Sequence, residues 1–115
     1  MALAEKQIYY VGVDLGGTKI LTGVYDQDLK FLGKMKLSTK ADRDYPEVVE
    51  RIARCVKEAV DECDLTLEQI TALGIGAPAA VDPDKGRVIF APNLKWQDKP
   101  LQQDLARALG VPVFL

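Results

Sequence analysis

The chain has 115 residues, a length that fits one domain and excludes the two-lobed architectures that many enzymes close around a substrate. Hydrophobic residues make up 48% of the sequence, which suits a globular core and excludes wholesale disorder. The net charge of −2 comes from 15 basic and 17 acidic residues that are interspersed, and no long apolar run or secretory signal is found. We therefore expect a cytoplasmic protein that binds neither nucleic acid nor membranes.

Three strands are predicted at the start of the chain. An apolar and aromatic run over residues 8–13 predicts a buried strand that ends at a turn containing Gly16 and Gly17. Residues 19–25 predict the second strand. Residues 29–37 predict the third, in which lysines alternate with apolar residues. The short turns favour antiparallel pairing, and a lysine-rich face is typical of a sheet edge.

A helix is predicted to begin near Asp44, because Asp44 and Glu47 form an acidic version of a capping box. Apolar residues then recur at three- and four-residue spacing over 48–63, which predicts one buried stripe. Thr66 and Gln69 predict a further short capped turn.

The two cysteines lie within this predicted helix. Cys55 and Cys63 are separated there by ~12 Å, because a helix rises about 1.5 Å per residue. A disulfide requires Cα atoms within ~7 Å, so we expect no bond between them. We interpret both as small hydrophobic residues in a reducing compartment, with Cys63 on the apolar stripe and Cys55 at its border.

The second half of the chain predicts alternating strands and a helix. A strand over residues 71–78 is followed by a small hairpin around the turn at 83–86, then by a second helix and a last strand over 111–115. Asp98 is expected to cap the second helix. The inner face of that helix is predicted to comprise Leu101, Leu105, Ala108 and Leu109.

The element order indicates an α/β fold. A mixed sheet is predicted from this order: three hairpin-linked strands, a helix and a strand, a small hairpin, and a final helix and strand. This is the order of the actin-like (ribonuclease H-like) ATPase domain. Because the sequence stops on the apolar strand over 111–115, we expect it to be the front part of a longer protein.

The sharpest motif joins the first two strands. Asp14 ends a buried strand immediately before Gly16, Gly17 and Thr18. Glycine N–H groups can converge on an anion without hindrance from a Cβ atom, and a neighbouring Asp can hold Mg²⁺ directly or through water. The motif therefore predicts a phosphate-binding hairpin with a metal anchor, and the alternative is an ordinary tight turn with an incidental Asp. The chain continues into a strand, which excludes a Walker loop and a dinucleotide fingerprint.

Three motifs in order carry a resemblance to a known family. They are Val13-Asp14-Leu15-Gly16-Gly17-Thr18-Lys19-Ile20, then Gly74-Ile75-Gly76-Ala77-Pro78 with Val81-Asp82, and then Ala91-Pro92-Asn93-Leu94 with Trp96. Together they resemble the ROK family of bacterial sugar kinases and repressors, and its glucokinases in particular. The resemblance covers the chain from Tyr10 onward.

The resemblance implies an ATP-dependent kinase with ATP and Mg²⁺ as ligands. Asp14 would help to position the Mg²⁺, and the backbone of Gly16, Gly17 and Thr18 would meet the β- and γ-phosphates. Lys19 would contribute positive potential or simply begin the second strand; both interpretations stay open.

The resemblance also implies which residues line the sugar side of the cleft: Ala77, Pro78, Ala79 and Asn93. An Asn amide both donates and accepts hydrogen bonds, which suits sugar hydroxyls, although a loop Asn can instead bond to its own backbone. Ala79 stands where the family usually has a second glycine, so a positive φ there would be strained. Trp96 would stack on a pyranose ring or, as we favour, fill space under the loop.

The resemblance also implies what lies outside residues 1–115. The family's catalytic Asp, in a Glu-Asn-Asp-Ala stretch, would follow Leu115, and the zinc motif, the second phosphate loop and the adenosine pocket belong to its later part. We therefore assign no catalytic residue and no zinc ligand here, and we interpret residues 1–115 as an N-terminal lobe that is inactive alone.

In full length, the resemblance implies a homo-oligomeric hexose kinase with glucose as the favoured substrate. Two alternatives are the sugar-sensing lobe of a ROK-type transcriptional repressor and a noncatalytic sugar-binding module. A repressor would carry a helix-turn-helix segment before the first strand, where only about seven residues precede it here.

Overall fold

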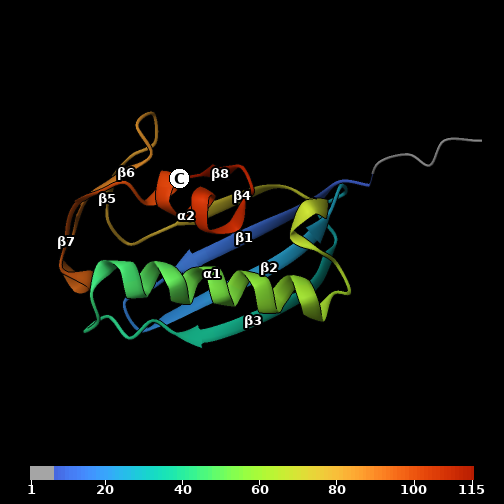
Figure 1. The fold of residues 1–115 in the computed structure, drawn as a ribbon, viewed down its shortest axis with the longest axis horizontal. Helices are drawn as coiled ribbons and strands as arrows, with labels where there is room; N and C mark the ends of the chain where they lie inside the picture. The colour runs from blue at the N-terminus through green and yellow to red at the C-terminus, as the bar shows by residue number, and fades with distance from the viewer. Residues whose placement is uncertain (1–6) are drawn as a thin grey trace, which may run out of the picture.

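The computed structural model describes residues 7–115, which form a five-stranded sheet, a smaller sheet and two α-helices (Figure 1). The five-stranded sheet has the order β3-β2-β1-β4-β8. Its strands are β1 (Tyr9–Leu15), β2 (Lys19–Asp26), β3 (Phe31–Ser38), β4 (Ile70–Gly76) and β8 (Val113–Phe114). The pairs β1-β2 and β2-β3 are antiparallel, whereas β1-β4 and β4-β8 are parallel. The predicted mixed sheet is confirmed, with the lysine-rich β3 at one edge.

The smaller sheet has three antiparallel strands instead of the predicted two. They are β5 (Ala80–Asp82), β6 (Arg87–Ala91) and β7 (Trp96–Lys99), and in Figure 1 they lie beyond one end of the larger sheet. Residues 96–99 have no apolar pattern that would predict a strand, because three of the four are polar. In the structure, Trp96 is the one buried residue of β7. Short 3₁₀ turns at Leu67–Gln69 and Pro92–Leu94 complete the connections.

The first helix, α1 (Tyr45–Glu62), packs its apolar stripe against β2, β3 and α2. Asp44 is its N-cap residue, but the Asp44 side chain makes no capping hydrogen bond, so the predicted capping box is wrong. Pro46 supplies no N–H in the first turn, and the Glu47 carboxylate lies 3.6 Å from Arg43 instead of reaching back to the cap. The capped turn predicted at Thr66 and Gln69 is confirmed.

The second helix, α2 (Leu101–Leu109), has Pro100 as its N-cap, so the prediction that Asp98 caps it is wrong. The Asp98 carboxylate instead accepts a 2.6 Å hydrogen bond from Arg87 Nε, which ties the start of β6 to the end of β7. This contact lowers the pKa of Asp98. Ala108 is exposed rather than on the inner face, and the three buried residues of α2 are the leucines.

Both cysteines are free thiols, as predicted. Their burial is the reverse of the prediction: Cys55 is fully buried and Cys63, the C-cap residue of α1, is half-buried. The Cys55 sulfur accepts a 3.3 Å hydrogen bond from the hydroxyl of Thr22, and burial raises the pKa of both thiols. Cys55 therefore belongs to the core between α1 and the sheet.

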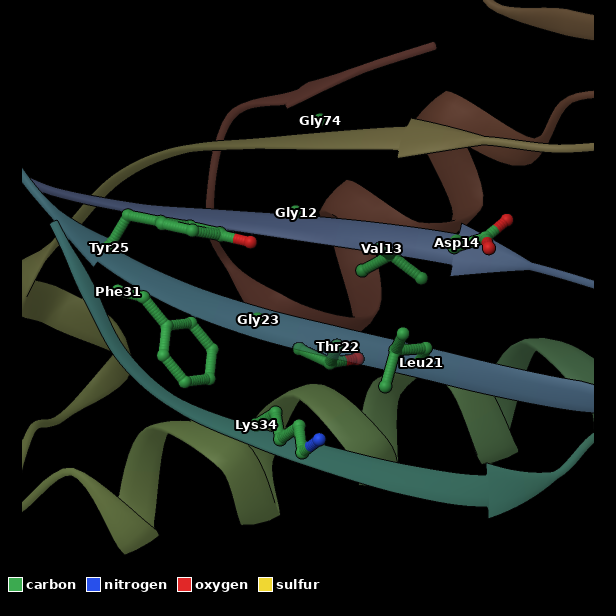
Figure 2. Close-up of a pocket in the computed structure, with 10 residues that line it drawn as sticks. All are labelled: Gly12, Val13, Asp14, Leu21, Thr22, Gly23, Tyr25, Phe31, Lys34 and Gly74. Carbon is green, nitrogen blue, oxygen red and sulfur yellow. The ribbon is translucent and has the colours of Figure 1, made fainter. Parts of the chain in front are cut away.

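The two helices cover one face of the larger sheet. Figure 2 views the sheet from the other face, and α1 and α2 lie behind it. Val11 and Val13 are buried on the helix side, whereas Asp14 is exposed. Within residues 7–115, no helix is long and apolar enough to cross a membrane.

The hairpin between β1 and β2 is closed by a hydrogen bond from the Gly16 N–H to the Lys19 carbonyl, 2.9 Å long. A Cβ atom on Gly16 would lie 2.9 Å from that same carbonyl oxygen. Glycine is needed at this position because the backbone itself occupies the space where a side chain would begin. By contrast, a Cβ atom on Gly74 in β4 would meet nothing within 4 Å.

We expect Gly16→Ala to lower the free energy of unfolding by about 1–3 kcal/mol, because the new methyl group must push the turn apart. Gly74→Ala is the matched control and should change it by less than about 0.5 kcal/mol. Urea denaturation followed by circular dichroism measures both values. Equal losses in the two variants would contradict the close contact at the hairpin.

Candidate functional site

The candidate site lies where two neighbouring parallel strands end. In the register of β1 and β4, Asp14 is opposite Gly76. The hairpin over residues 16–19 follows β1, and Ala77, Pro78 and Ala79 follow β4. The predicted phosphate-side and sugar-side segments therefore leave the sheet side by side, at the edge where open α/β sheets bind their ligands.

Asn93 reaches this edge from the smaller sheet. A Cβ atom on Gly17 would lie 3.3 Å from the Cβ of Asn93, so the Asn93 side chain lies directly beside the Gly17 backbone. Asn93 is exposed, and within the described part of the chain its amide makes no hydrogen bond. The alternative in which Asn93 bonds to its own backbone is not observed, and the side chain is free to meet a ligand.

The hairpin offers two unpaired backbone donors. The Gly16 N–H is used by the turn, whereas among residues 7–115 no hydrogen-bond acceptor is found for the N–H groups of Gly17 and Thr18. Thr18 and Lys19 are exposed, and Lys19 is the first residue of β2. The arrangement combines free amides, a hydroxyl and an ammonium group, which suits an anionic ligand.

Asp14 stands beside the hairpin with an exposed carboxylate. Within the described residues it makes no ion pair or side-chain hydrogen bond. It borders a hollow of about 310 Å³ on the open face of the sheet, and Figure 2 shows Asp14 and Tyr25 at opposite ends of that hollow. The hollow does not include the hairpin, so we place the candidate site at the strand ends, where the unpaired donors lie.

The segment after β4 forms a tight turn. The Ala79 N–H donates to the Ala77 carbonyl over 2.9 Å, and Pro78 is the central residue of this three-residue turn. Ala79 is not among the residues with positive φ. Alanine in place of the family's usual glycine therefore causes no backbone strain here.

Trp96 is a core residue rather than a platform for a sugar. It is 2% exposed, and its ring packs edge-on against Tyr45 with 5.0 Å between ring centroids. The Tyr45 hydroxyl donates to Asp104 over 2.7 Å, and burial raises the pKa of Tyr45 well above its usual range. Among the described residues, the Trp96 indole N–H has no hydrogen-bond partner.

One residue of the site has no signal in the sequence. Thr39 follows β3 and is fully buried, and it donates two hydrogen bonds to carbonyls of the hairpin. A threonine after a strand is unremarkable in a sequence, so only the fold reveals this contact.

Comparison with known proteins gives a consistent result. A profile of the ROK family matches residues 10–115. A glucokinase from Thermotoga maritima is 37% identical over 106 residues, which are 91% of this chain and 32% of that protein. A putative xylose repressor from Caldicellulosiruptor sp. is 30% identical over 91% of this chain and 26% of its own length. The chain thus spans about a third or less of these relatives.

A solved structure shares the fold. The ROK family glucokinase from Streptomyces griseus, determined in complex with glucose and AMPPNP, superposes with a TM-score of 0.80 and 34% identity over 93% of this chain and 32% of that one. The predicted actin-like α/β architecture is confirmed. With a family match over nearly its whole length, this chain belongs to the ROK family.

Proposed function

We propose that this chain forms the N-terminal lobe of an ATP-dependent hexose kinase, with glucose as its substrate. The observation that carries the proposal is the position of the Asn93 side chain directly beside Gly17, next to the strand end that bears Asp14. The similarity to a glucokinase from T. maritima and to the S. griseus glucokinase bound to glucose and AMPPNP supports this choice of donor and acceptor.

Phosphoryl transfer depends on holding the donor phosphate and the attacking hydroxyl close together. In the proposed arrangement, the free amides of Gly17 and Thr18 bind the terminal phosphates of ATP. The Asn93 amide and the segment Ala77–Ala79 bind the sugar. Because the Asn93 side chain lies beside Gly17, a sugar held by Asn93 would lie next to a phosphate held by the hairpin.

The residues present fit the Mg²⁺ that accompanies ATP. Mg²⁺ takes oxygen ligands and is usually held by one or two carboxylates together with substrate phosphates and water. Asp14 offers one exposed, unpaired carboxylate next to the hairpin, and within residues 7–115 no cluster of three or more potential ligands competes with it. When bound, the ion neutralises charge that develops on the phosphates, and Lys19 adds positive potential from the start of β2.

The proposal assigns the remaining parts of the enzyme to sequence after Leu115. The base that accepts the sugar proton, the zinc motif and the adenosine pocket would all lie there, so the 115-residue chain should bind ligands weakly and catalyse nothing. We also propose that the full-length kinase is a homo-oligomer of the cytoplasm, a reducing compartment that suits the two free thiols found in residues 7–115.

A second candidate is a sugar-sensing lobe, favoured by the similarity to the putative xylose repressor. A sensor needs the sugar side of the site but has no use for a nucleotide. Binding of Mg-ATP to the full-length protein, measured by calorimetry, therefore separates the two functions. Sugar binding without nucleotide binding would support the sensor and contradict the kinase.

We expect Asp14→Asn, made in the full-length protein, to lower kcat/KM for hexose phosphorylation by about 100-fold or more, because a neutral amide holds Mg²⁺ poorly. A coupled assay for ADP with glucose, mannose and N-acetylglucosamine measures this. Asp61→Asn, an exposed position on α1, is the control and should leave the rate unchanged. A folded wild-type protein that forms no ADP with any hexose would refute the kinase proposal.

We expect Asn93→Ala to raise the KM for the hexose by about tenfold, since losing hydrogen bonds to a bound ligand costs roughly 1–2 kcal/mol. The exposed Gln97 in β7 provides the matched control, Gln97→Ala, and should leave that KM unchanged. Steady-state kinetics at saturating Mg-ATP give both values. An unchanged hexose KM in Asn93→Ala would remove Asn93 from the sugar site.

A further inference from the structure

We propose that Thr39 is a positioning residue that orients the Gly17 amide, one of the two proposed phosphate-binding donors of the hairpin over residues 16–19. The inference rests on the function proposed above and deepens it. It names a residue that lies outside the three sequence motifs and that nucleotide binding would nevertheless require. Thr39 follows β3 directly and has no exposed surface, so it cannot contact a ligand itself.

Thr39 holds the hairpin at two points. Its hydroxyl donates to the Gly16 carbonyl over 2.8 Å, and its backbone N–H donates to the Thr18 carbonyl over 2.8 Å. Side chain and main chain of one residue therefore fix carbonyls on both sides of Gly17. Thr39 is one of only two polar residues that are fully buried among residues 7–115.

These bonds set the direction of the amides. A peptide bond is planar and trans, so the carbonyl of one residue and the N–H of the next point in opposite directions. Holding the Gly16 carbonyl toward Thr39 turns the Gly17 N–H away from Thr39. Holding the Thr18 carbonyl does the same to the Lys19 N–H. Thr39 thereby presents the Gly17 amide as a donor on the side away from its own strand.

The hairpin needs such a restraint because of its composition. Gly16 and Gly17 lack the Cβ atoms that restrict backbone rotation, so the peptide between them can turn over more readily than others. The hydroxyl of Thr39 binds the carbonyl of that same peptide. Without the hydroxyl, orientations in which the Gly17 N–H points inward become populated, and the apparent affinity for a phosphate falls in proportion.

Thr39 is itself held from the helix layer. The preceding residue, Ser38, accepts a 2.7 Å hydrogen bond at its carbonyl from Arg51 Nε of α1. The following residue, Lys40, has a φ of 53°, so the chain turns sharply after Thr39. A connected series of contacts therefore runs from α1 through the end of β3 to the hairpin.

The inference makes a prediction that separates positioning from general stability. Thr39 donates hydrogen bonds to the hairpin and, within residues 7–115, makes none to Ala77, Pro78, Ala79 or Asn93. Loss of its hydroxyl should raise the KM for Mg-ATP by about fivefold, the usual effect of one neutral hydrogen bond, and leave the KM for the hexose within twofold. A merely structural role would lower the amount of active enzyme and change neither KM.

The experiment uses steady-state kinetics of the full-length protein in three forms: wild type, Thr39→Val and Thr39→Ser. Valine keeps the shape of threonine without the hydroxyl, and serine keeps the hydroxyl without the methyl group. We expect the raised nucleotide KM in Thr39→Val and a value near that of the wild type in Thr39→Ser. Circular dichroism and urea denaturation establish that each variant is folded.

The outcomes distinguish this inference from the proposed function. An active wild type with an unchanged nucleotide KM in Thr39→Val, or with both KM values raised equally, overturns the inference alone. A folded wild type that forms no ADP with any hexose overturns both. Should Thr39→Val not fold, Arg51→Met removes the contact to Ser38 from a partly exposed position. It should raise the nucleotide KM about twofold, and no change there would overturn the inference equally.

Discussion

The parallel pairing of β1 with β4 is the constraint on which the arrangement of the candidate site depends. It places Asp14 opposite Gly76, although β2, β3 and α1 all lie between these residues in the chain. Because both strands run in the same direction, the segments that follow them must leave the sheet at the same edge. The hairpin with its free amides and the Ala77–Ala79 turn become neighbours for this reason, and no local feature of either segment would bring them together.

The site is built from flexible backbone that is restrained by buried neighbours. The hairpin contains two adjacent glycines, yet a side chain on Gly16 would collide with the Lys19 carbonyl, and Thr39 holds carbonyls on both sides of Gly17. Glycine thus allows two backbone segments to come close together. The hydrogen bonds restrict the backbone rotation that glycine would otherwise permit. Donors that are oriented before the ligand arrives bind it at a lower entropic cost.

Local patterns predicted most of the larger sheet and both helices. Alternating and apolar runs are enough for β1, β2 and β3, and apolar spacing is enough for α1, because these signals reside in neighbouring residues. The sequence predictions are wrong where contacts between residues far apart in the chain determine the local structure. Asp98 pairs with Arg87 instead of capping α2, and Cys55 is buried against the sheet. The polar segment that forms β7 has Trp96 as its one buried residue. The motif residues were identified from the sequence, but the hydrogen bonds of Thr39 to the hairpin follow only from the folded geometry.

Asn93, like the hairpin, is held in place by buried neighbours, but these neighbours are apolar. It is exposed, whereas Leu94 directly after it and Trp96 shortly beyond are each only 2% exposed. The Trp96 ring packs edge-on against Tyr45, whose hydroxyl is bonded to Asp104, so the loop is fastened to both helices. A hydrophobic anchor therefore holds the Asn93 loop, and a buried threonine holds the hairpin between β1 and β2. Because the Asn93 side chain lies beside Gly17, mutations in the two supports should not be additive, as is usual for residues that are close together.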